Sequence, residues 1–569
     1  MKRFVAALSV CLLLFAAAVG VLAQEKPQQK KKKTTKSYEY CVEYLNEVKE
    51  HLTTSYIHAE KVNAGNLMRA AALGMAEVLS APEFRSVDAE GRDAIAARLR
   101  EGTFETIEAI FAALKEVVEA HKIKKLDFVK IADAAAMGML KEVGDPFSHI
   151  FTQEELMKLM QIMFGQARDE SLGLSVAPED GKLTVAYVMF GYPAYVAGLE
   201  IGDVIVAING KPAADMDFKA ANEALQAKAG TTTTLTIKRE GLLKDYTFEL
   251  NQFKDRPKDV IHAMLPGQIG YLRMTIFDLS LAGSVRSALK ALEEDKMCGL
   301  ILDLRHNPGG ALPAATSVAD EFIGDKKLIT YTETKYKPKM PFEFLQDMLG
   351  QQPTEFRATK KSRFEKLPVV LLIDKASASA SELLSGAFQD TGRAILIGET
   401  TYGKGVGQTA IPLWKSGGSG GMFGLPSRFL YLTVMKYYLP TGRSIDHIGV
   451  SPDIEVPAPK LKGEKFDRVW QLKRSGKLEE YVNSNYEANK QLFHELAMYD
   501  AFDSSRYPGF ESFCKGLKTK LGPDEVREEL RQAIRRKIEN ESGKRFPYDC
   551  QSDVQLQAAL LEMQDTLGK

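Results

Sequence analysis

One stretch of the chain combines a buried strand, a turn of small residues and the start of a helix. The apolar run at residues 367–373 has the length and composition of a buried strand. Asp374-Lys-Ala-Ser-Ala-Ser-Ala-Ser381 follows, and residues 382–390 have a helical composition. The first N–H groups of a helix lack partners inside it, so a turn of this kind can expose a serine and hold an oxyanion beside it.

A serine in such a turn needs a base before it can act as a nucleophile. None of the eight histidines lies near this segment in sequence, but Lys404 stands between two glycines in Tyr402-Gly-Lys-Gly-Val-Gly-Gln408. A lysine becomes a base near neutral pH only where burial lowers its pKa, because desolvation disfavours the ammonium ion. A serine with a buried lysine is therefore the candidate pair. The alternative is a helix N-cap made by Ser379 or Ser381 and a solvated Gly-Lys-Gly loop.

The string Ser377-Ala-Ser-Ala-Ser-Glu382 resembles the signature of the C-terminal processing peptidases, also called tail-specific proteases. In that family the middle serine is the nucleophile, the lysine of Gly-Lys-Gly is the general base, and a glutamine four residues later orients the lysine. The resemblance therefore implies Ser379, Lys404 and Gln408 as the catalytic residues. Their separations of 25 and 4 residues match the family pattern.

A second string of the same family follows a buried strand at residues 299–305: His306-Asn-Pro-Gly-Gly310. In the family, a glycine amide of this turn joins the amide after the nucleophile in the oxyanion hole. The implied donors are Gly309 or Gly310, together with Ala380. We expect His306 to be a surface-turn residue and not a member of a triad, because the family tolerates varied residues there. Asp303 and Glu382 are expected to be structural carboxylates and not a glycosidase pair.

Residues 165–252 look like a PDZ domain. Ser171-Leu-Gly-Leu-Ser-Val176 resembles its carboxylate-binding loop, although glycine is common where Ser171 stands. The implied peptide-binding residues are Leu172, Gly173 and Leu174. Such a domain adds an extended peptide to a sheet edge and captures its terminal carboxylate with backbone N–H groups. A PDZ domain that only packs on its neighbour and gates the site is the alternative.

The pattern along the chain predicts a multidomain α/β protein. Alternating strands and helices, with strands at 269–277 and 299–305 and helices at 281–294 and 314–322, predict a serine peptidase core with a mainly parallel sheet over residues 258–456. An N-terminal helical region is expected at 37–160, and Gly144-Asp-Pro-Phe-Ser148 at its end resembles the element that precedes the PDZ domain in the family. A charged helical region at 463–569 is expected to pack simply or to support a homo-oligomer.

The N-terminus predicts export. Lys2 and Arg3 precede an apolar run that ends at Val21-Leu-Ala23, so residues 1–23 are typical of a signal peptide and residues 24–36 of a basic disordered linker. The mature enzyme is then periplasmic or extracellular. If the segment is not cleaved, it anchors the protein in a membrane.

Composition and cysteine spacing give no support for a nucleic-acid partner, a zinc site or a cofactor. The formal net charge is zero, which gives no support for a nucleic-acid partner. The cysteines match no zinc spacing, and neither a metal nor an organic cofactor is implied. Cys514 and Cys550 are the most plausible disulfide, while Cys298 is expected to be a buried free thiol. The glycine-rich residues 417–424 are expected to form a flexible loop.

These observations together predict an exported serine endopeptidase that acts on proteins or peptides with free, apolar C-terminal tails. Its PDZ domain would capture the tail and its Ser-Lys pair would form an acyl-enzyme. A catalytically silent PDZ scaffold or chaperone of the same fold is one alternative. A non-peptidase binder of apolar ligands is another, and in both the pair would be expected to be lost.

Overall fold

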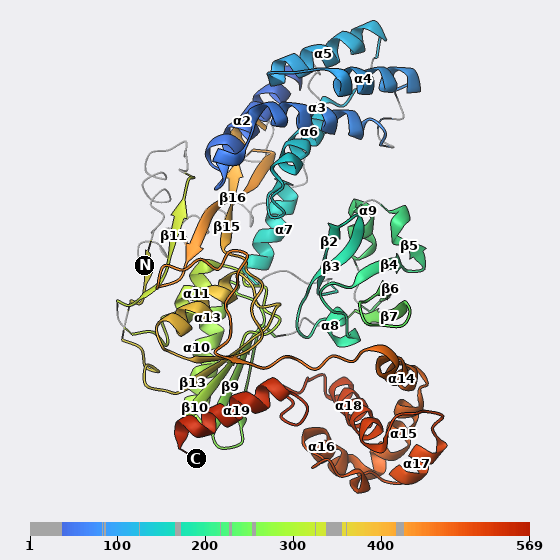
Figure 1. The fold of residues 1–569 in the computed structure, drawn as a ribbon, viewed down its shortest axis with the longest axis vertical. Coiled ribbons are helices and arrows are strands. Elements are labelled where there is room, and N and C mark those ends of the chain that lie inside the picture. The colour runs from blue at the N-terminus through green and yellow to red at the C-terminus, as the bar shows by residue number, and fades with distance from the viewer. Residues whose placement is uncertain are drawn as a thin grey trace, which may run out of the picture. The chain divides into compact units, whose positions relative to one another are not determined.

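The computed structural model describes residues 37–81, 84, 87–123, 126–165, 172–216, 218–226, 230–252, 258–324, 326–336, 355–359, 361–416 and 426–568 (Figure 1). The expected signal peptide, the basic linker, Ser171 and the glycine-rich loop lie outside these residues. No helix among the described residues has both the length and the apolar composition needed to cross a membrane. The chain divides into two compact units. The first contains residues 1–162, 331–356 and 405–438, and the second contains residues 163–330, 357–404 and 439–569.

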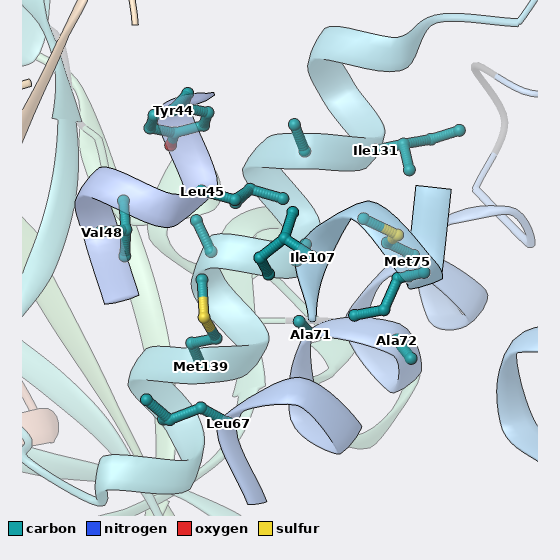
Figure 2. Packing of buried hydrophobic residues seen from close by; sticks show 14 of the residues in the cluster. Tyr44, Leu45, Val48, Leu67, Ala71, Ala72, Met75, Ile107, Ile131 and Met139 are labelled. Carbon is teal, nitrogen blue, oxygen red and sulfur yellow. The ribbon is translucent and has the colours of Figure 1, made fainter. Parts of the chain in front are cut away.

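The first unit begins with a bundle of amphipathic helices, whose apolar stripes meet in one core (Figure 2). Helices α3 and α6 approach closely because Gly74 and Gly138 face each other; a Cβ on either would lie 2.3 Å from a carbonyl oxygen of the opposite helix. The helices of the bundle are α2 (Ser37–Thr54), α3 (Ala64–Val78), α4 (Ala89–Glu101), α5 (Ile107–Ala120) and α6 (Phe128–Val143), and α7 (Gln153–Met163) follows them in the chain.

A five-stranded sheet lies mostly in the first unit, and its pairs β1–β16, β11–β16 and β15–β16 are antiparallel. Its order is β1-β16-β11-β12, with β15 also paired to β16. The pairing of His149 with Tyr431 shows that the end of the predicted helical region forms a strand with a segment almost 300 residues later. The strands are β1 (His149–Thr152), β11 (Leu328–Thr334), β12 (Glu355–Arg357), β15 (Val406–Pro412) and β16 (Arg428–Tyr438).

The second unit contains a small sheet of order β2-β3-β4-β6-β7, with β5 paired to β4. Among the described residues, strand β2 pairs on one side only, with β3, so it is an edge strand of this sheet. The elements are β2 (Leu174–Glu179), β3 (Lys182–Val188), α8 (Pro193–Ala197), β4 (Val204–Ile208), β5 (Lys211–Pro212), α9 (Phe218–Ala224), β6 (Thr232–Lys238) and β7 (Tyr246–Asn251).

A six-stranded sheet of order β17-β14-β13-β10-β9-β8 forms the central part of the second unit. All neighbouring pairs are parallel except β8 with β9, which confirms the predicted α/β core with a mainly parallel sheet. The elements are β8 (Val260–Leu265), β9 (Ile269–Met274), α10 (Leu281–Glu294), β10 (Gly299–Asp303), α11 (Leu312–Ala319), β13 (Val369–Ile373), α13 (Ala380–Asp390), β14 (Ile395–Gly398) and β17 (Ile454–Glu455).

The C-terminal helices also belong to the second unit. Helix α19 packs its apolar side chains, Leu556 and Met563 among them, on one face of the central sheet. The helices are α14 (Gly463–Arg474), α15 (Lys477–Tyr486), α16 (Lys490–Met498), α17 (Phe510–Gly516), α18 (Pro523–Ser542) and α19 (Val554–Leu567).

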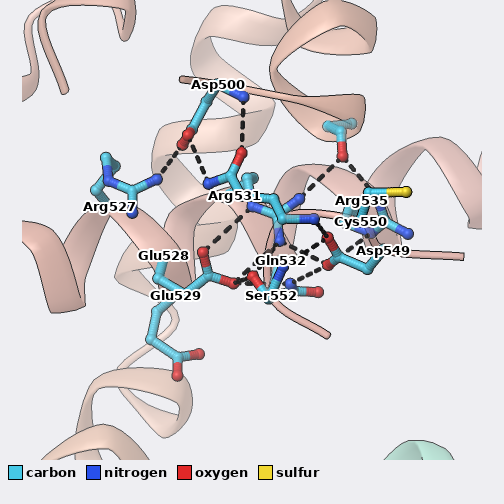
Figure 3. Close-up of polar contacts among 12 residues, drawn as sticks. Asp500, Arg527, Glu528, Glu529, Arg531, Gln532, Arg535, Asp549, Cys550 and Ser552 are labelled. Carbon is cyan, nitrogen blue, oxygen red and sulfur yellow. Dashed lines mark hydrogen bonds and ion pairs between the residues drawn. The ribbon is translucent and has the colours of Figure 1, made fainter. Parts of the chain in front are cut away.

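A buried polar network holds the C-terminal helices together (Figure 3). Asp500 accepts from Gln551 and Tyr507 and pairs with Arg527, and Arg531 of α18 binds Asp549 at 2.6 Å. Such a network stabilises one arrangement, because each buried charge has a partner.

The expectations for the cysteines are corrected by the structure. Cys514 and Cys550 are both free thiols, so the proposed disulfide does not form. Cys298 is only partly buried, and its thiol donates to the carbonyl oxygens of Gly267 and Gln268.

Candidate active site

The serine turn lies between strand β13 and helix α13, as the sequence predicts. Ser379 is the N-cap residue of α13 and has φ 56° and ψ −112°, a backbone conformation that is costly for a residue with a side chain. Ser377 and Ser381 are fully buried, and their hydroxyl groups donate to the carbonyl oxygens of Leu304 and Asn307 at 2.9 Å. Ser379 is partly exposed, so it is the accessible serine of the three.

Glu382 ties the serine turn to the loop that carries Lys404. Its carboxylate Oε2 accepts the backbone N–H of Ser379 at 2.7 Å and that of Lys404 at 2.8 Å. The other oxygen, Oε1, accepts the N–H of Gly403 and the hydroxyl of Thr401, each at 2.6 Å. Burial raises the pKa of Glu382, and the four donated hydrogen bonds oppose that effect. Glu382 is therefore a structural carboxylate, as expected, and its partners are the two candidate catalytic segments.

The loop before Lys404 is fixed from a second side. Gly403 has φ 90°, and a Cβ there would lie 3.1 Å from backbone atoms of His447 and Ile448. Its carbonyl accepts the N–H of His447 at 2.8 Å, and the N–H of Tyr402 donates to Ser377 at 3.0 Å. The Lys404 residue itself is partly buried. Only a glycine fits before the lysine in this backbone conformation.

Gln408 lies in the first unit, on strand β15. Its side-chain amide donates to the hydroxyl of Thr433 on β16 at 3.0 Å, next to an irregularity in the β15–β16 register. The division between the two units falls between Lys404 and Gly405. Gln408 and Lys404 are thus four residues apart in the chain but belong to different units.

The glycine turn after β10 lies against the serine turn. A Cβ on Gly309 would be 2.5 Å from the carbonyl oxygen of Ala378 and 2.7 Å from the nitrogen of Ala380, so any side chain there would displace the serine turn. Asn307 is fully buried, and its carbonyl accepts the N–H of Ala378 at 3.0 Å. Its side-chain oxygen accepts the N–H of Gly309 at 2.9 Å.

Gly310 is placed differently from Gly309. Phe277 pairs with this turn through the Gly309 carbonyl and the Ala311 N–H, and neither bond uses the N–H of Gly310. The value of φ at Gly310 is 140°, and a Cβ would lie 2.3 Å from the Phe277 carbonyl oxygen. Asn307 was not singled out from the sequence, although it lies inside the His-Asn-Pro-Gly-Gly string.

Asp303 is the centre of a buried ion network beneath the glycine turn. Arg273 and Arg305 both bind its Oδ2, at 3.1 and 2.7 Å, and Arg305 also binds Asp553 at the start of α19. Burial acts to raise the pKa of Asp303, but the two arginines outweigh it and hold the pKa well below its usual range. The carboxylate stays ionised and structural, as expected.

The predicted peptide-binding residues lie at the start of the edge strand β2. Leu172 is buried, and its carbonyl accepts the N–H of Ala194 at 2.9 Å. Gly173 has φ 71°, and a Cβ there would lie 2.0 Å from Tyr192, so a side chain cannot be placed without moving the loop. Leu174 is the first residue of β2.

His306 lies in the turn after β10, as expected, but its side chain is partly buried and contacts other residues. Its ring Nε2 lies 3.3 Å from Asp374 Oδ2, and its backbone N–H donates to Asp374 Oδ1 at 3.0 Å. Tyr195 of α8 contacts the ring edge-on, with 5.0 Å between ring centroids. The sequence could not indicate this contact, because the three residues are far apart in the chain.

The chain is similar to known peptidases and to PDZ domains. The pattern of Peptidase family S41 matches residues 268–456, and the PDZ domain pattern matches residues 184–239. The Carboxy-terminal-processing protease of Bartonella bacilliformis is 33% identical over 363 residues, which span 62% of this chain and 77% of the relative. The Carboxy-terminal processing protease CtpB of Bacillus subtilis is 28% identical over 469 residues, covering 78% and 86%.

A solved structure, the photosystem II D1 C-terminal processing protease, is 25% identical with a TM-score of 0.46, covering 70% of this chain and 95% of that one. Within the described residues, no cluster of three or more His, Cys, Asp or Glu side chains is arranged to hold a metal ion. The sequence relatives and both matched patterns lead to one assignment. The chain belongs to peptidase family S41, among the carboxy-terminal-processing proteases, and is a serine-type peptidase with a PDZ domain.

Proposed function

We propose that this protein is an exported endopeptidase that cleaves proteins near their C-terminal tails through a Ser379–Lys404 pair. The observation that carries the proposal is the Glu382 carboxylate, because one of its oxygens accepts the backbone N–H groups of both residues. The serine turn and the lysine loop are therefore held as one structural element. The partial exposure of Ser379, beside two buried serines, supports its choice as the nucleophile.

In the proposed reaction, the neutral amine of Lys404 takes the hydroxyl proton of Ser379 while the serine oxygen attacks the scissile carbonyl carbon. The C–N bond then breaks, and the lysine returns the proton to the leaving amine. Water, deprotonated in the same way, hydrolyses the ester and frees the serine. Gln408 is the residue that the family resemblance assigns to orient the lysine.

The oxyanion would be held by the backbone N–H groups of Ala380 and Gly310. Ala380 is the first residue of α13, where a helix leaves its N–H groups without helical partners. Of the two glycines that the sequence left open, Gly310 is favoured, because the N–H of Gly309 is bound to the Asn307 side chain. Two N–H groups converging on a developing negative charge stabilise the transition state strongly.

The PDZ domain would recognise the substrate tail at Leu172, Gly173 and Leu174. No strand of the described residues pairs with the outer edge of β2, and this supports the role, since an extended peptide can pair with such an edge. The substrate residues that precede the bound tail would then be presented to Ser379. Export rests on the signal-like residues 1–23, and the substrates would be proteins outside the cytoplasm.

The test is a cleavage assay with a protein that ends in an apolar tail, followed by intact mass measurement of the products. We expect cleavage by the unaltered enzyme near the free tail and no cleavage by Ser379→Ala. Cleavage by Ser379→Ala at the normal rate would refute the assigned nucleophile. An inactive but normally folded Ser379→Ala, together with tail-independent cleavage by the unaltered enzyme, would refute only the role of the PDZ domain.

A further inference from the structure

The PDZ domain presents two aromatic side chains to the peptidase core. Phe190 and Tyr195 lie beside each other, with 4.8 Å between their ring centroids. Phe190 lies over the guanidinium group of Arg273 at 3.4 Å from the ring centroid, and Tyr195 meets the ring of His306 edge-on at 5.0 Å. Both contacts are formed within the second unit, between the PDZ domain and the ends of strands β9 and β10.

His306 stands where three parts of the site meet. Its ring contacts both Tyr195 and the Asp374 carboxylate. It is followed directly by Asn307, whose carbonyl accepts the N–H of Ala378 in the serine turn. The backbone of His306 has φ 57°, a strained conformation that its surroundings must maintain.

Asp374 connects His306 to the serine turn. Its Oδ1 accepts the backbone N–H of His306 and that of Ala376, each at 3.0 Å, and lies 3.1 Å from the Ser377 hydroxyl. Ser377 precedes Ser379 by two residues. A movement of the His306 ring therefore alters the contacts of the carboxylate that anchors the turn.

We infer that His306 is a positioning residue that couples docking of the PDZ domain to the geometry of the Ser379 turn. With Tyr195 in place, the ring of His306 is held on Asp374 and the turn keeps its active shape. When the PDZ domain leaves, the ring loses its aromatic wall and the anchor on the turn relaxes. His306 takes no part in proton transfer to the substrate, and the inference rests on the proposed function of Ser379.

Protonation of His306 should make docking of the PDZ domain depend on pH. Burial is the largest effect and lowers the pKa of His306; Arg273 and Arg305 lower it further, while Asp374 and the Val188 carbonyl raise it. Undocking hydrates the ring and removes the burial effect, so the pKa rises in the undocked state. The docked arrangement is then favoured by the neutral ring at higher pH and weakened as the pH falls.

The experiment uses the full chain and a short ester substrate that carries no tail for the PDZ domain. We expect Tyr195→Ala to lower kcat by about two- to tenfold, the range for loss of one aromatic pair, with KM little changed. Tyr195→Phe keeps the ring and should restore kcat. Leu243→Ala is the matched control, because Leu243 is a PDZ side chain that is 61% exposed.

His306→Asn tests the same coupling from the core side. Asparagine tolerates the left-handed backbone but lacks the ring. His306→Asn should lower kcat as Tyr195→Ala does, and the double variant should have a kcat no lower than that of the poorer single variant. Both single variants should exchange amide hydrogens faster at residues 374–381. The fall in kcat on acidification should be shallower in His306→Asn.

Any one of three results would overturn the inference. They are a wild-type kcat in both Tyr195→Ala and His306→Asn, effects of the two substitutions that multiply in the double variant, and unchanged hydrogen exchange at residues 374–381. Thermal unfolding of Tyr195→Ala shows whether its PDZ domain is folded. If it is not, His306→Asn, which leaves the PDZ domain intact, decides the matter alone. An active Ser379→Ala would refute the proposed function instead, so the two failures are distinguishable.

Discussion

Glu382→Gln removes the charge from the carboxylate that binds both candidate catalytic segments, while keeping the size of the side chain. The carboxylate accepts four hydrogen bonds, two at each oxygen. The amide has one accepting oxygen, and its NH₂ group would face two donors, either Ser379 and Lys404 or Gly403 and Thr401. Two hydrogen bonds to a charged group are lost, at about 1.5–3 kcal/mol each.

The lost hydrogen bonds cost about 3–6 kcal/mol. This cost is offset in part because the charge is no longer buried, and the remainder is shared between folding stability and the alignment of the serine with the lysine. If most of it falls on the alignment, kcat drops by about a hundredfold to ten-thousandfold, since each 1.4 kcal/mol is tenfold in rate. The assay is kcat on a short ester, with urea unfolding of the same preparations. The control is Glu293→Gln, which breaks only the exposed pair with Arg363 and should cost less than about 1 kcal/mol.

A Glu382→Gln enzyme that keeps full kcat and full stability would refute this account of the site. Loss of stability with unchanged kcat in the folded fraction would refute the link between Glu382 and the alignment of Ser379 with Lys404.

Three further predictions concern catalysis and recognition. Ser379→Ala and Lys404→Ala should each reduce kcat by several orders of magnitude, and the double variant should be little worse, because residues that act as a unit are not additive; an additive double variant would contradict the pair. Amidating the C-terminus of a tail peptide should weaken its binding by about 1.5–3 kcal/mol, roughly tenfold to a hundredfold, as measured by titration calorimetry. A bulky residue at Gly173 should weaken binding in the same way. Equal affinity for the amidated and free-acid peptides would exclude capture of the carboxylate. Burial raises the pKa of Glu382, so its carboxyl takes up a proton at a higher pH than an exposed glutamate. We therefore expect kcat to fall as the pH drops through that raised pKa, while the stability gained from proton uptake is present at low pH and lost as the pH rises. A pH–kcat profile that Glu382→Gln leaves unchanged would contradict this.

Local patterns predicted the elements of the peptidase core closely. Helix α10 has the bounds that the sequence predicts, and strands β10 and β13 lie within the predicted apolar runs. Helix α11 begins at Leu312, two residues earlier than expected, because Pro313 is favourable in the first helical turn.

Features that depend on distant pairing could not be predicted. Strand β1 was taken as part of a helical region, because its partner β16 lies almost 300 residues later. Within the site, Glu382 was identified as structural, but its partners at 401–404 follow only from the folded chain. The choice between Gly309 and Gly310 likewise required the Asn307 side chain, and His306 required Tyr195.

The central claim is that Ser379 is the nucleophile and that Lys404 activates it. The most direct measurement is mass spectrometry of the enzyme after reaction with a fluorophosphonate probe, which labels activated serines. We expect a single label on Ser379 in the unaltered enzyme, and almost no label in Lys404→Ala. A label on Ser377 or Ser381, or equal labelling of Ser379 in Lys404→Ala, would contradict it.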